Sequence, residues 1–179
     1  MHNRNKRFMT ILVAIFMTMI SGYAQNKAIG TTFSFSGIGI MYEHLISDEC
    51  FITADIRTEL GEVFMERTDT PGLSASVIAN FIITSWKSSN GNDLIFYAGP
   101  GMTVGSANDF HISRGYFFGL KGRVGIECLF KSRNISISAS LCPIIGSHMV
   151  ISDDSIRMRQ YVNGIINSIM PEIGVKYMF

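Results

Sequence analysis

The chain has 179 residues, with 15 lysines and arginines and 14 aspartates and glutamates, so only 16% of its residues are charged. A typical soluble domain has about 25% charged residues, and a near-neutral chain offers no basic surface for nucleic acid. No run of about 20 apolar residues is present that could form a spanning helix. Length and composition therefore favour a single strand-built domain that has too little charge to cover a soluble surface.

The first 24 residues have the pattern of a secretory signal peptide. Arg4, Lys6 and Arg7 precede the apolar segment 8–20, and Gly22-Tyr23-Ala24 supplies small residues for a cleavage site. The apolar segment is too short for a membrane anchor, and the alternative is a short buried helix. We predict a signal peptide at residues 1–24 and a mature domain at residues 25–179.

Three segments follow in which apolar and polar residues alternate, the pattern of strands with one apolar face. They cover residues 28–35, 37–45 and 51–61, with turns at 36–37 and 47–49. The third has an apolar face with Ile52, Ala54, Ile56 and Leu60 and a polar face with Thr53, Asp55, Arg57 and Glu59. The second places Glu43 on its polar face.

Two more strands are predicted at residues 73–86 and 94–105. Turn-forming residues precede the first of them at 67–72 and separate the two at 88–93. Pro100 lies inside the second strand and has no N–H to donate to a ladder, so we expect a bulge or a local irregularity there.

The hairpin from Tyr116 to Met149 has the clearest alternation in the chain. In its first arm the even positions from Phe118 to Phe130 are apolar or glycine, and the odd positions carry most of the charge. The second arm, 135–149, repeats the alternation with isoleucines and serines. Ser132-Arg133 between the arms is predicted to form a tight turn.

The last part of the chain changes character twice. Residues 151–170 lack sustained alternation and predict a long loop with room for a helical turn. Residues 171–179 then place Ile173, Val175, Tyr177 and Phe179 on one face and Glu172, Gly174 and Lys176 on the other. This segment is predicted to be the final strand.

Counting the segment 28–35 separately gives eight strands. An even number puts both ends of a membrane barrel on one side, the short turns there, and the longer loops opposite. The periplasmic turns are then 47–49, 87–93 and 132–133, and the extracellular loops are 36–37, 63–72, 107–115 and 150–170. The predicted fold is all-β: a closed antiparallel eight-stranded transmembrane β-barrel preceded by a cleaved signal peptide.

Several short motifs resemble the small outer-membrane protein β-barrel domains of Gram-negative bacteria, the OmpA- and OmpX-like barrels. They are Gly39–His44, Tyr97–Gly101, Gly125–Glu127 and the terminal Gly174–Phe179. The resemblance implies an outer-membrane location in a Gram-negative bacterium, with outer-membrane lipid around the barrel. It also implies that Tyr177 and Phe179 form a C-terminal signal for the barrel-assembly machinery.

The interior of an eight-stranded barrel is just wide enough for side chains to fill. Ten charged residues are predicted to point inward, five acidic and five basic: Glu43, Asp55, Glu59, Glu127 and Glu172 with Arg57, Lys121, Arg123, Lys131 and Lys176. Since an unpaired buried charge costs several kcal/mol, equal numbers predict an ion-paired lumen closed by its own side chains. A small channel for ions or solutes is the alternative.

We therefore predict a structural or surface-interaction role, in adhesion, envelope integrity or partner binding, with the loop 150–170 as the candidate contact surface. A soluble lipid-binding barrel, with both faces reversed, is a further alternative. A lipid-modifying enzyme is another, because Asp109, His111 and Ser113 share one loop and His148, Ser152, Asp153 and Asp154 lie in or beside another. Their spacing gives no catalytic arrangement, so we predict no enzyme, metal site or cofactor, and three free thiols at Cys50, Cys128 and Cys142.

Overall fold

The computed structural model describes residues 26–64, 66, 70–87, 92–109, 112–130, 133–152 and 155–179. The predicted signal peptide at 1–24 lies outside these residues, as do Lys131, Ser132, His111, Asp153 and Asp154. The elements are β1 (Lys27–Ser34), β2 (Gly37–Ser47), β3 (Cys50–Glu59), α2 (Gly61–Phe64), β4 (Gly72–Lys87), β5 (Asn92–Asp109), β6 (Ile112–Phe130), β7 (Ile135–Leu141), β8 (Ile144–Ser152), β9 (Ser155–Gln160), α3 (Val162–Asn167) and β10 (Pro171–Met178).

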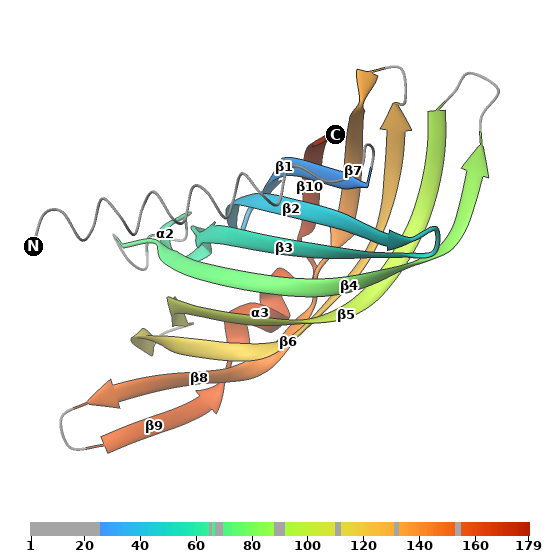
Figure 1. Cartoon of the computed structure of the whole chain (residues 1–179). Helices are drawn as coiled ribbons and strands as arrows, with labels where there is room; N and C mark the ends of the chain where they lie inside the picture. Colours follow the sequence, from blue (N-terminus) through green and yellow to red (C-terminus); the bar gives the residue numbers. More distant parts are fainter. Residues whose placement is uncertain are drawn as a thin grey trace, which may run out of the picture.

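The strands form one sheet that closes on itself. Its order is β5-β4-β3-β2-β1-β10-β7-β6-β8-β9, and β5 also pairs with β6, which completes a ring. The described residues form ten strands, but β8 continues β7 along β6 and β9 pairs with β8, so the wall of the ring has eight strands. Every pairing is antiparallel. The predicted all-β, closed, eight-stranded antiparallel barrel is confirmed (Figure 1).

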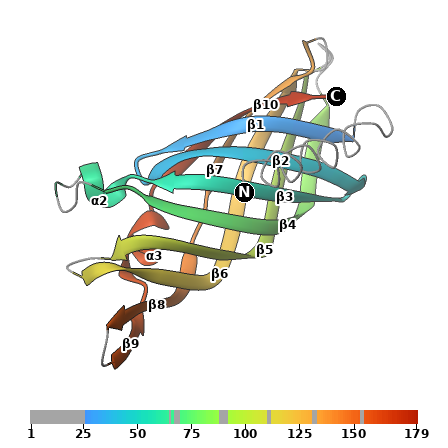
Figure 2. The same cartoon turned by 60° about the vertical axis from the view of Figure 1, so that its left-hand side comes forward.

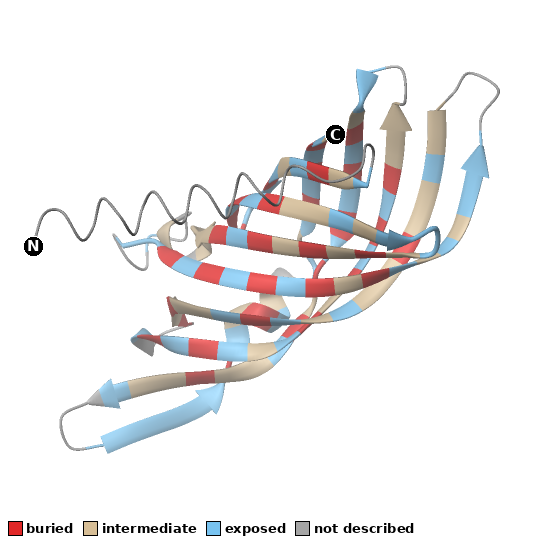
Figure 3. Cartoon of the chain, in the orientation of Figure 1, coloured by how far each residue is buried: buried red, intermediate tan, exposed pale blue. Residues whose placement is uncertain are grey.

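The two faces of the wall are turned as the alternation predicts. On β6, Leu120 and Val124 are 70% and 44% exposed, whereas Lys121 and Arg123 between them are 3% and 2% exposed. Figure 3 shows buried residues alternating with exposed ones along the first half of β4, and with mostly intermediate ones along β3. Because successive side chains of a strand point to opposite faces, the apolar residues cover the outside of the barrel and the charged residues fill it.

The loop predicted at 151–170 is wrong over its first half, while the helical turn expected within it corresponds to α3. Strand β8 runs on to Ser152, and the chain returns as β9, where Met158 pairs with Met149. This two-stranded ribbon projects from the barrel wall in both views (Figures 1 and 2). Helix α3 then leads into β10 and lies against β8. The alternation of Ile156 and Met158 with Arg157 and Arg159 was too short to be recognised as a strand.

Pro100 does not shift the register of the sheet. Pairs Ile78–Gly101 and Phe81–Ala98 lie in one register on either side of it, and the bulge between β4 and β5 lies instead between Ile82 and Thr84. Pro100 pairs with Gly122 of β6 on its other side. The ladder between β4 and β5 lacks the pairs Ala79–Pro100 and Asn80–Gly99, so the expected local irregularity is present, without a bulge.

The barrel has two open ends. The end called here the α2 end contains the β1–β2 turn, α2 and the carboxyl ends of β5 and β8. The opposite end contains the carboxyl end of β10 (Figure 1). Helix α2 begins at the last residue of the third predicted strand, Gly61, and extends into the predicted loop 63–72. No helix in the described part of the chain is long and apolar enough to cross a membrane.

Candidate functional site

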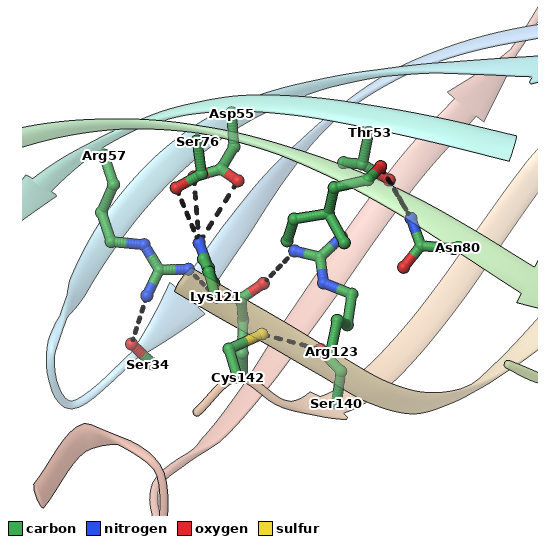
Figure 4. A network of polar contacts seen from close by, with 12 residues as sticks. Ser34, Thr53, Asp55, Arg57, Ser76, Asn80, Lys121, Arg123, Ser140 and Cys142 are labelled. Atoms are coloured by element: carbon green, nitrogen blue, oxygen red, sulfur yellow. Dashed lines mark hydrogen bonds and ion pairs between the residues drawn. The ribbon is translucent and has the colours of Figure 1, made fainter. Parts of the chain in front are cut away.

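The centre of the lumen contains an ion pair supported by a hydroxyl group. Lys121 on β6 extends across the barrel to Asp55 on β3, with its Nζ atom 3.3 and 3.4 Å from the two carboxylate oxygens. The same Nζ donates to the Ser76 hydroxyl on β4 at 3.0 Å. Figure 4 shows these contacts converging on the lysine. All three side chains are buried, so the pair is held within the barrel rather than at its surface.

A second cluster is organised by Glu172 on β10. Arg123 Nη2 donates to Glu172 Oε1 at 2.8 Å, and Arg57 contacts the other carboxylate oxygen. Arg57 also donates to the hydroxyls of Ser36 and Ser34 at 3.3 and 3.5 Å, near the β1–β2 turn. One carboxylate thus joins guanidinium groups from β3 and β6 across the width of the barrel.

A third cluster surrounds Lys176 of β10. Its Nζ donates to Glu43 Oε2 on β2 at 2.8 Å and to Glu127 Oε2 on β6 at 2.6 Å. The ammonium group also lies 5.7 Å from the centre of the Phe51 ring, within the range of a cation–π contact. Tyr97 and Phe51 pack edge to face, with their ring centres 5.2 Å apart. Aromatic rings therefore fill the lumen beside this ion pair.

Nine of the ten inward charges predicted from the sequence lie in the described part of the chain, and Lys131 lies outside it. Eight of them form the three clusters. The ninth, Glu59, accepts a hydrogen bond from the Ser74 hydroxyl at 2.5 Å. The sequence placed these residues on one face, but it did not indicate which acid would meet which base.

Little space remains between the central side chains. The cavity lined by Arg57, Lys121, Glu172 and Cys142, among others, has a volume of about 10 Å³. This is roughly the smallest volume that holds one water molecule. Cys142 is one of three free thiols, and its sulfur lies 3.8 Å from the Ser140 hydroxyl oxygen. The arrangement neutralises charge and fills space at this level of the barrel.

A separate cluster at the α2 end was not recognised from the sequence. The Tyr161 ring stacks on Phe117 with centres 4.3 Å apart, and His148 stacks on the same tyrosine at 6.3 Å. The carboxylate of Asp109 accepts hydrogen bonds from the backbone N–H groups of Val162 and Asn163, at 3.0 and 2.8 Å. These contacts fix the first turn of α3 to β5 and β6.

Some of the residues considered for catalysis have structural contacts, and others lie outside the described part of the chain. Asp109 caps α3, and His148 Nε2 lies within hydrogen-bonding distance of the Ala107 carbonyl oxygen, at 3.0 Å. Both side chains are buried. His111, Asp153 and Asp154 lie outside the described residues. In the part of the chain that is described, Asp109 and His148 position an element of the fold. No periodic pattern in the sequence marks either role.

The residues of the expected C-terminal signal lie where the last strand of the barrel pairs with the first. Tyr177 pairs with Ile29 of β1 and with Ile135 of β7, and its side chain is exposed. The backbone N–H of Phe179 donates to the Lys27 carbonyl at 2.9 Å. The last residues of the chain therefore join it to its first strand.

Comparison with known proteins identifies no relative: no protein-family model, curated protein or solved structure matches this chain.

Proposed function

We propose that this protein is an integral outer-membrane β-barrel with a structural or surface-interaction role and a lumen closed by its own side chains. The observation that carries the proposal is the distribution of polarity in the barrel. Charged side chains form ion pairs in its interior, while large aliphatic side chains cover its exterior. A barrel dissolved in water would have the reverse arrangement.

The exposed residues extend around the whole wall rather than forming one patch. Large apolar side chains that are more than half exposed occur on β2, β3, β4, β5, β6, β8 and β10: Ile40, Ile56, Val77, Met102, Leu120, Ile145 and Ile173. A soluble monomer seldom exposes a contiguous apolar surface larger than a few hundred Å². Hydrocarbon chains of a membrane are a suitable solvent for such a band, and closed barrels leave no wall strand with unpaired backbone groups in lipid.

Two features of the sequence support export to the outer membrane. Residues 1–24 have the composition of a signal peptide. Strand β10 also carries an aromatic residue, Tyr177, on its exposed face, a pattern that resembles a barrel-assembly signal. Interaction with partners is assigned to the α2 end, because there the β8–β9 ribbon projects beyond the wall (Figure 2). A rigid barrel that presents projecting elements is a common way to position a binding surface.

Cell fractionation tests the location. The full-length protein is expressed in a Gram-negative host, and its membranes are separated and washed with alkaline carbonate. We expect the mature chain in the outer-membrane fraction, resistant to the wash, and able to fold into lipid vesicles with a heat-dependent shift in gel mobility. A chain recovered folded from the soluble periplasm would contradict the proposal.

A further inference from the structure

Strand β9 is paired on one side only. It pairs with β8 along its whole length, and its other edge has no neighbour in the described part of the chain. All six of its residues, Ser155–Gln160, are exposed. An unpaired edge is a template for another strand, and natural proteins usually protect one. The free edge of β9 lies on the ribbon that projects from the barrel (Figures 1 and 2).

The hydrogen bonds of the ribbon show which backbone groups are free. Tyr161 N–H donates to Gly146 O of β8 at 2.9 Å, so the backbone of Tyr161 faces β8. Because backbone groups of successive residues point to opposite sides of an antiparallel strand, those of Arg159 and Arg157 also face β8. The N–H and C=O groups of Met158 and of its alternate neighbours therefore point to the open edge.

The side chains of β9 separate into two different faces. Arg157 and Arg159 lie on one face, and Ile156 and Met158 lie on the other. Cross-strand neighbours extend the second face with Ile151 and Met149 of β8. Neither arginine forms an ion pair with a residue that the structure describes. The open edge is thus flanked by two exposed positive charges on one side and by an apolar strip on the other.

This charge pattern disfavours a second copy of the chain as the partner. Two β9 strands paired antiparallel, with matching faces and most of their length overlapping, would put Arg157 opposite Arg157 or Arg159. Like charges directly opposite one another destabilise a strand pair, whereas opposite charges contribute about 0.2–1 kcal/mol. The complementary strand has acidic residues at alternate positions and apolar residues between them.

We propose that β9 binds an extended peptide segment of another protein, in which acidic and apolar residues alternate, as an additional strand of the ribbon. Main-chain hydrogen bonds to Met158 and its alternate neighbours supply affinity, and the two arginines select the acidic face. The inference specifies the partner class for the proposed surface-interaction role. It rests on the proposed function in one respect, that the β8–β9 ribbon lies outside the membrane.

Peptide binding to the full-length protein in nanodiscs of zwitterionic lipid tests the proposal. The probe is a fluorescent ten-residue peptide that alternates glutamate with valine, and the control has lysine in place of glutamate. We expect the glutamate peptide to bind at least tenfold more tightly by fluorescence anisotropy, and the double variant Arg157→Glu/Arg159→Glu to reverse this preference. Equal binding of the two peptides, or an unchanged preference in the variant, would overturn the proposal.

A proline at the edge distinguishes strand addition from simple charge attraction. Met158→Pro removes an N–H that faces the open edge, a position where an edge strand tolerates proline, whereas Met158→Leu keeps that N–H. We expect the proline variant to lose binding at least tenfold and the leucine variant to bind as the wild type does. A glutamate peptide N-methylated at alternate residues serves as a second test should the proline variant disturb the ribbon. Undiminished binding to the proline variant and of the N-methylated peptide would refute strand addition. Insertion of the barrel into membranes is measured separately and tests the proposed function.

Discussion

A single carboxylate, that of Glu172, is shared by the guanidinium groups of Arg57 and Arg123. Removing its charge leaves two buried cations without a carboxylate, and loss of one partner of a buried pair costs about 3–5 kcal/mol. We expect Glu172→Gln to lower the free energy of unfolding by about this amount. Arg57→Gln should cost less, because Glu172 keeps Arg123 as its partner. Urea unfolding in lipid vesicles measures both, and an equal loss in the two variants would contradict the shared carboxylate.

Val124 provides the matching prediction for the outer face. It lies on the outside of β6, midway between Phe118 and Phe130, where the proposed membrane is deepest. An arginine on the lipid face near the middle of a bilayer costs about 2–4 kcal/mol. Val124→Arg should therefore make the free energy of folding into vesicles less favourable by this amount, while Val124→Leu should leave it nearly unchanged. If both variants fold equally well, the outer face of β6 does not contact lipid.

At the scale of elements, α3 depends on a contact from elsewhere in the chain. Tyr161 occupies its N-cap position without a side-chain capping hydrogen bond, and Asp109 of β5 accepts the bonds from its first N–H groups instead. Loss of a cap costs about 1 kcal/mol, so Asp109→Ala should speed amide exchange at Val162 and Asn163 about fivefold. Amides of β10 serve as the internal control. Unchanged exchange at the two positions would show that stacking of Tyr161 alone holds the helix.

The elements that the sequence predicted correctly are those with long alternation. Strands β3, β4, β6 and β7 each present several apolar residues to one face, so that a shift by one residue would reverse every side chain. Strand β9 and helix α3 are short, and all of β9 is exposed, so neither is defined by a buried face of its own. Their positions follow from contacts with β8 and with Asp109, which no local pattern encodes.

For the whole molecule, the filled lumen predicts that the barrel does not conduct ions. Ion pairs cross the barrel at three places, and the central cavity has room for about one water molecule. In planar bilayers we expect no steady conductance steps from the purified protein at neutral pH. A larger outer-membrane porin reconstituted in the same way is the positive control. Reproducible steps from this protein would favour the small channel over a structural or interaction role.

The sequence by itself determined the number of wall strands and the face on which each charge lies, whereas the register between strands came from the structure. Side-chain direction in a strand follows from position parity alone, so a lasting alternation is sufficient to assign it. Partner choice within the lumen, the extra ribbon of β8 and β9, and the seat of α3 were decided only by the tertiary structure. Closure of the sheet brings Lys121 to Asp55 and Lys176 to Glu43 over separations of 66 and 133 residues, because the curvature of the wall sets which inward side chains meet across the barrel.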